Sequence, residues 1–94
     1  MHKYELVCII HPELDDNAFN GVLEKVRGWI TDAGGSVDKL DIWGRRRMAY
    51  SIHKKREGQY ALLNISMPPA ATAELDRSLR FNESVLRYMI TLVD

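Results

Sequence analysis

The sequence has a single cysteine and no long apolar run, and both shortages exclude whole classes of protein. One cysteine, Cys8, excludes an internal disulfide framework and any zinc or iron–sulfur site built from several cysteines. No apolar segment approaches the roughly 18–20 residues of a membrane-spanning helix. The first four residues lead straight into a strand-like segment and not into a signal peptide. We therefore expect a small soluble intracellular protein, with residues 1–94 forming one domain.

The motifs of common catalytic and cofactor sites are also missing. The sequence contains no P-loop, no Gly-x-Ser-x-Gly and no Gly-x-Gly-x-x-Gly. His2, His11 and His53 are scattered without the spacing of a metal site. Cys8 lies in an alternating strand-like segment, where we interpret it as a small core residue and not as a nucleophile. We expect no catalytic residue, no metal, no other cofactor, and neither a membrane nor a small molecule as partner.

The net charge is zero, because 13 Lys and Arg residues balance 13 Asp and Glu residues. That balance would ordinarily argue against a nucleic-acid partner. Residues 45–56, however, contain six basic residues and no acidic one. Since the local field decides whether a polyanion is attracted, the total charge is misleading here.

Strand and helix patterns alternate along the chain. Residues 4–10 are apolar and β-prone, and Pro12 ends that segment. Residues 15–17 provide helix-start side chains, and the apolar residues that follow repeat at helical spacing until Gly34 and Gly35. The second half predicts a long strand over 37–52 bent near Gly44, a turn over 54–58, a strand over 60–67, a helix after Pro69, a turn over 81–84 and a strand over 85–93.

This order, βαββαβ, predicts an α+β protein of the ferredoxin-like class. We expect a four-stranded, mainly antiparallel sheet with both helices on one face. Alternation then points Leu6, Cys8, Ile10, Leu86, Tyr88, Ile90 and Leu92 toward the helices. The opposite face receives five candidates for contact with a protein partner: Val7, Ile9, Tyr60, Leu62 and Met89. An uncovered apolar face usually marks a contact surface, although central strands that are apolar on both sides are an equally open explanation.

The basic segment is the strongest local signal. Guanidinium groups suit phosphate oxygens, and alternation along a strand separates Arg46 from Arg45 and Arg47. Together with the loop cations Lys54, Lys55 and Arg56 they would follow a folded RNA backbone along the sheet edge, with Tyr50 and Trp43 stacking on a base or simply packing. The alternative is a charged edge strand protected against aggregation, and the absence of acids favours a polyanion.

Three further cations are candidates for RNA contact. Arg80 and Arg87 flank the turn before the last strand, and Lys3 opens the first. Because the first and fourth strands are neighbours in this topology, Lys3 and Arg87 would form a second positive spot. Their spacing alone favours ordinary surface charge.

Several stretches resemble the bacterial family of small-subunit ribosomal protein number six. They are spread over essentially the whole chain: residues 3–6, 12–14 and 34–35, then 41–52 with Lys54 and 58–60, and finally 75–77 and 82–87. The resemblance implies a ferredoxin-like fold and a structural role in the small subunit of the cytoplasmic ribosome. It also implies two partners, the central domain of small-subunit rRNA and ribosomal protein number eighteen.

Two other classes of function share this fold, because fold alone does not fix function. An acylphosphatase-like enzyme would need a phosphate-binding loop after the first strand, but residues 11–16 are acidic and would repel the substrate. A regulatory domain that dimerises through its sheet would use the apolar face but would leave the arginine run without a purpose.

Overall fold

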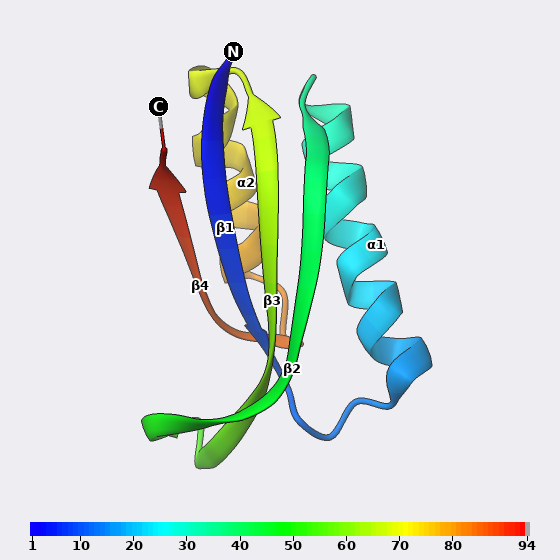
Figure 1. Ribbon diagram of the computed structural model, residues 1–94, viewed down its shortest axis with the longest axis vertical. Helices are drawn as coiled ribbons and strands as arrows, with labels where there is room; N and C mark the ends of the chain where they lie inside the picture. The colour runs from blue at the N-terminus through cyan, green and yellow to red at the C-terminus, as the bar shows by residue number, and fades with distance from the viewer. Residues whose placement is uncertain (94) are drawn as a thin grey trace.

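The computed structural model describes residues 1–93, and Asp94, at which the expected domain ends, lies outside the described residues. Its elements are β1 (His2–Ile10), α1 (Asp16–Asp32), β2 (Ser36–Ile52), β3 (Lys55–Met67), a 3₁₀ turn (Pro69–Ala71), α2 (Thr72–Arg80) and β4 (Val85–Leu92). The strands form one antiparallel sheet in the order β2-β3-β1-β4, and both helices cover the same face (Figure 1). The predicted βαββαβ order and ferredoxin-like class are confirmed.

Helix α1 begins and ends where the sequence indicates. The Asp15 carboxylate caps its first turn by accepting the Ala18 N–H at 2.8 Å, which satisfies one of the free N–H groups of a helix start. At the other end Gly34 adopts φ +88°, and the Gly35 N–H donates to the Ile30 carbonyl at 2.9 Å. A left-handed glycine after the last turn is the common helix stop.

The core lies between the sheet and the two helices. Leu6, Cys8 and Ile10 of β1 are fully buried there, packed with the alternating apolar residues of β3 and the apolar stripes of α1 and α2. Burial raises the pKa of the Cys8 thiol to about 12. The thiol therefore stays protonated at neutral pH, and the interpretation of Cys8 as a core residue is confirmed.

The connection between β2 and β3 differs from the prediction. Of the residues expected to form a turn over 54–58, only Lys54 does so; residues 55–58 belong to β3, and Ile52 pairs with Lys55 across a two-residue turn. That turn consists of His53 and Lys54, with φ of +50° and +64°. Both strands consequently extend beyond the rest of the sheet and bend away from it (Figure 1). We call this two-stranded extension, residues 45–57, the arm.

A register shift at the end of β1 corrects a second expectation. The pairing of β1 with β4 slips between Ile9 and Ile10, so that Ile9 lies opposite Arg87 and Ile10 opposite Val85. Leu86, expected to face the helices, packs instead with Ile9 and Met48 in a separate small cluster. A bulge turns one side chain to the other face of a sheet, and Val85 takes the place against the core.

Gly58 lets the arm close onto this small cluster. A Cβ added at Gly58 would lie 2.3 Å from Ile9 Cγ2, and β-branched Ile9 has little freedom to move aside. We expect Gly58→Ala to lower the free energy of unfolding by about 1–3 kcal/mol through overpacking. Gly28→Ala is the matched control, because nothing lies within 4 Å of a Cβ there and alanine in a helix gains about 0.5–1 kcal/mol. Urea unfolding that shows equal effects at the two sites would contradict this account.

Candidate nucleic-acid and protein interface

The arm carries several basic side chains that form no ion pair with any described residue, although the acidic residue Glu57 lies opposite Arg47 in the strand register. Within residues 1–93, the side chains of Arg45, Arg47, Lys54 and Arg56 form neither a hydrogen bond nor an ion pair. Lys55 of the arm pairs with Glu13, and outside the arm Arg27 pairs with Glu24, Lys39 with Asp41 and Arg80 with Asp76. Four cations without an ion pair in this part of the chain therefore lie close together on the arm, where a polyanion would meet them.

A hollow of about 360 Å³ lies along the arm, on the strand residues before and after its hairpin turn. Arg47 of β2 and Arg56 of β3 line it from opposite strands, with Tyr50 and Ser51 between them. Two guanidinium groups flanking one hollow match the oxygens of a phosphate group, which each of them can bind through paired N–H donors. Sequence reasoning counted Arg56 among the loop cations of the basic segment, but because it placed the residue in a turn it did not bring Arg56 to the same hollow as Arg47.

Arg46 leaves Arg45 and Arg47, as alternation predicts, and lies against aromatic rings. Its Cζ is 5.0 Å from the centroid of the Trp43 ring, a distance typical of a cation–π contact. Trp43 stacks in turn on Tyr60, with centroids 6.5 Å apart and ring planes inclined by 14°. The three side chains form a layer where the arm joins the sheet, and this layer fixes the direction of the Arg46 charge.

Tyr50 and Arg87, both candidates for RNA contact, are brought together from distant parts of the sequence. The Arg87 guanidinium donates a hydrogen bond to the Tyr50 hydroxyl, and its Cζ lies 5.9 Å from the Tyr50 ring centroid. This contact ties the exposed side of the arm to β4. Arg87 thereby joins the positive surface of the arm.

Lys3 does not join the positive surface of the arm. The prediction that Lys3 and Arg87 form a second positive spot is wrong. Lys3 pairs with Ser66 at one end of β1, whereas Arg87 pairs with Ile9 near the other. Six residues of strand separate the two positions by roughly 20 Å. Lys3 lies instead near Asp38, whose pKa is held below its ordinary value by hydrogen bonds from Ser66 and Ser36 and by the Lys3 charge.

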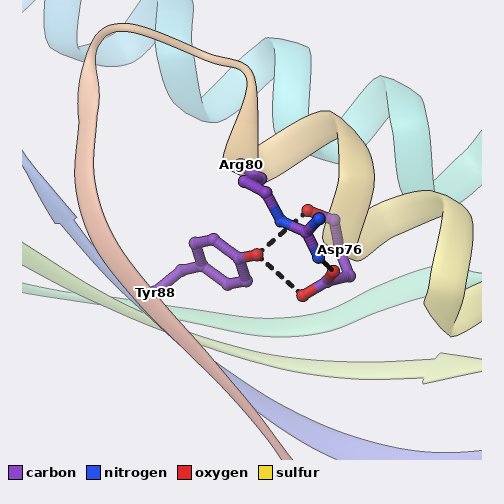
Figure 2. A network of polar contacts seen from close by, with 3 residues as sticks. All are labelled: Asp76, Arg80 and Tyr88. Carbon is purple, nitrogen blue, oxygen red and sulfur yellow. Dashed lines mark hydrogen bonds and ion pairs between the residues drawn. The ribbon is translucent and has the colours of Figure 1, made fainter.

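Arg80 is part of a polar network between α2 and β4 (Figure 2). The Tyr88 hydroxyl donates to the Asp76 carboxylate at 2.7 Å and lies 3.1 Å from the Asp76 carbonyl, while Arg80 pairs with the same carboxylate. The Tyr88 hydrogen bond and the Arg80 charge hold the pKa of Asp76 below its ordinary value. The charge of Arg80 is therefore balanced locally, which the four-residue spacing from Asp76 could have indicated.

This network predicts a pH dependence of stability. Because the pKa of Asp76 is lower in the folded state, its ionised form stabilises the fold above the unfolded-state pKa of about 4. That contribution is lost as the pH falls through the lower folded-state value. In Asp76→Asn the difference between the free energies of unfolding at pH 7 and at pH 2 should be smaller than in the wild type. Tyr88→Phe should also make this difference smaller. A difference equal to the wild type in both variants would contradict the network.

On the outer face of the sheet, opposite the helices, three of the five partner candidates form a row. Val7 pairs with Leu62 of β3 on one side and with Met89 of β4 on the other. Val7 and Leu62 are half-buried, and Met89 is 53% exposed. We call these three residues the apolar row. It crosses three adjacent strands, so a partner would meet it as one continuous patch.

The other two candidates are partly covered by the chain itself. Ile9 is only 9% exposed because it packs with Met48 of the arm and Leu86, and Tyr60 lies under the Trp43 ring. Sequence reasoning missed Met48, since nothing in the local pattern shows that the arm bends over Ile9. A glycine inside a strand, Gly58, was the available signal, because such a glycine often marks the close approach of another segment.

The remaining chemistry of the described residues is sparse. Among residues 1–93, no three His, Cys, Asp or Glu side chains gather closely enough to hold a metal ion. Neither helix in that part of the chain has the length and apolar character required to cross a membrane.

Comparisons with known proteins point to one family. The sequence profile of ribosomal protein S6 matches residues 3–91. The chain is 48% identical over 90 residues to small ribosomal subunit protein bS6 of Paenarthrobacter aurescens, covering 96% of this chain and 89% of the relative. It is 51% identical over 87 residues to the protein of that name from Salinispora tropica, covering 93% and 91%. The crystal structure of 30S ribosomal protein S6 from Thermotoga maritima superposes with a TM-score of 0.92 at 26% identity, covering 98% of this chain and 87% of that one.

Proposed function

The chain belongs to the ribosomal protein S6 family, and from this premise we propose that it binds the central domain of small-subunit rRNA together with ribosomal protein number eighteen. Its role is that of a structural constituent of the small ribosomal subunit in the cytoplasm. The relatives it matches carry the name of a small-subunit protein, and these are structural proteins without a catalytic step.

The observation that carries the RNA part of the proposal is the uncompensated charge of the arm. Arg45, Arg47, Lys54 and Arg56 have no partner among residues 1–93, and the arm projects beyond the rest of the sheet (Figure 1). Placing phosphates against these side chains releases counterions from the RNA, which is the main source of affinity for a polyanion. Tyr50 and Arg87 extend the same surface. We include Lys3 and Arg80 as contacts of lesser weight, since both lie apart from the arm and near a carboxylate.

The protein part of the proposal uses the outer sheet face. The apolar row of Val7, Leu62 and Met89 supplies the central contact, with Tyr60 beside it and Ile9 supporting the surface from below. A patch of this kind contributes most when a partner removes it fully from water. Because the row and the arm lie on one connected side of the sheet, a single partner protein would be held against the RNA at the same time.

A titration with a central-domain fragment of small-subunit rRNA tests the proposal. The purified full chain should bind the fragment more tightly when ribosomal protein number eighteen is present than when it is absent. Raising the salt concentration from about 50 to 200 mM should weaken binding steeply, as expected for several phosphate contacts. A folded chain that binds the fragment under neither condition would overturn the proposal and would direct attention to sheet-mediated dimers or small phosphorylated ligands.

A further inference from the structure

A hollow of about 510 Å³ lies between the hairpin turn of the arm and the loops that follow β1 and α2, and it is separate from the hollow lined by Arg47 and Arg56. Its volume falls within the range of sites for small ligands. Three distant segments line it: the loop after β1 through His11, the hairpin turn through His53, and residues 80–83 after α2. The His11 N–H donates to the Ser84 carbonyl at 3.0 Å, which holds the first and third segments together.

Phe81 is the aromatic side chain of this hollow, and 74% of it is exposed. The hydrophobic core includes Leu79, two residues earlier, but not this ring. Around it lie histidine and amide side chains. A free aromatic ring beside cationic and amide groups is the combination with which proteins bind unpaired RNA bases, since every base offers a flat face for stacking.

The hairpin turn supplies a second, independent observation. His53 and Lys54 both adopt positive φ, which two-residue hairpin turns normally assign to Asn-Gly. Keeping a histidine and a lysine there stores backbone strain, and such strain is retained mainly where the side chains serve a ligand. The turn holds His53 at the edge of the hollow, and Lys54 follows it directly in the turn.

The polar groups of the hollow define what it can bind. Asn82 Oδ1 accepts the Ser84 N–H at 2.8 Å, so its NH₂ group is left to donate to a ligand. Glu83 is the one acidic residue among those lining the hollow, and the charge of Arg80 is balanced by Asp76. The positive charge available to a phosphate is therefore at the hairpin turn.

We propose that this hollow, which we name the Phe81 pocket, binds one unpaired nucleotide of RNA, with its base stacked on Phe81 and its phosphate beside His53 and Lys54. The inference rests on the proposed function, because the nucleotide belongs to the rRNA that the arm binds. It adds a stacking contact on Phe81 to a surface that otherwise acts mainly through charge.

Nuclear magnetic resonance of the ¹⁵N-labelled full chain tests the pocket directly with adenosine 5′-monophosphate, adenosine and inorganic phosphate as probes. The nucleotide should shift the amide signals of Phe81, Asn82 and His53, whereas phosphate alone should shift those of the hairpin turn. Phe81→Leu should weaken nucleotide binding at least about 5-fold, and Phe81→Trp should restore it. Shifts confined to other parts of the chain, or equal shifts by phosphate and by the nucleotide at Phe81, would overturn the inference.

Titration with the rRNA fragment separates this inference from the proposed function. Phe81→Leu should weaken binding about 5-fold or more with an unchanged salt dependence, because the substitution removes no charge. If the wild type binds and Phe81→Leu binds equally well, the pocket is overturned and the proposed function stands. If the folded wild type does not bind the fragment, the proposed function fails and the inference fails with it.

Discussion

Replacing Arg45, Arg46 and Arg47 together by glutamine should weaken binding to the rRNA fragment by roughly 100-fold or more. Charge-assisted hydrogen bonds contribute about 1.5–3 kcal/mol each, so losing only two of them reaches that value at 1.4 kcal/mol per tenfold change. The slope of log affinity against log salt should become shallower by roughly two to three units, because each phosphate contact contributes about 0.7–0.9. A fluorescence anisotropy titration at three or more salt concentrations measures both quantities.

The control for this variant removes the same charge from the helical face. Lys25, Arg27 and Arg77 lie on α1 and α2, on the side of the sheet opposite the apolar row. Replacing all three by glutamine lowers the net charge equally and should change affinity by only a few-fold through the long-range field. Equal losses in the two triple variants would show that the total charge, and not the position of the arm, determines binding.

Much of the fold follows from short-range patterns in the sequence. The acceptor side chain of Asp15 and the glycines 34 and 35 set the limits of α1, and the strict alternation of residues 61–67 sets the buried face of β3. These signals act within a few residues of the backbone that they control, so a single sequence is enough to expose them.

What the sequence could not show depends on pairing between distant segments. The shift between Ile9 and Ile10 that turns Leu86 away from the helices is a property of two strands together, and the distance of Lys3 from Arg87 follows from the same register. The sequence did not predict the arm for another reason. Its second strand is formed by charged residues after a His-Lys turn, a composition that is typical of loops. These residues pair as strands because β2 is long enough to continue beyond the sheet.

The sequence therefore predicted which residues belong to the candidate site, but not how these residues lie relative to one another. The sequence selected the arginines of the arm and the residues of the apolar row, and the structure brings Tyr50 to Arg87 and places Arg46 against Trp43. It also balances Arg80 with Asp76, which a count of basic residues cannot reveal. Ion pairing is what distinguishes cations that are available to RNA from those that stabilise the fold.

Met89→Glu should reduce the affinity for ribosomal protein number eighteen by at least about 100-fold while leaving the isolated chain folded. Met89 is 53% exposed, so a carboxylate there stays hydrated in the free protein and changes its stability by less than about 0.5 kcal/mol. In the complex the same carboxylate would be buried against an apolar surface without a partner, which costs several kcal/mol. Isothermal titration calorimetry with the partner protein measures the loss.

Leu92→Glu is the matched control for the apolar row. Leu92 lies on the same strand and is also 53% exposed, but it pairs with Tyr4 and belongs to the helix-facing side of the sheet. The two variants therefore add the same charge at the same exposure, and they differ in the face that carries it. If the partner binds to the outer face, Leu92→Glu should keep nearly the wild-type affinity. A loss that is equal in both variants, or larger in Leu92→Glu, would move the partner to the helical side of β4 and leave the apolar row without an occupant.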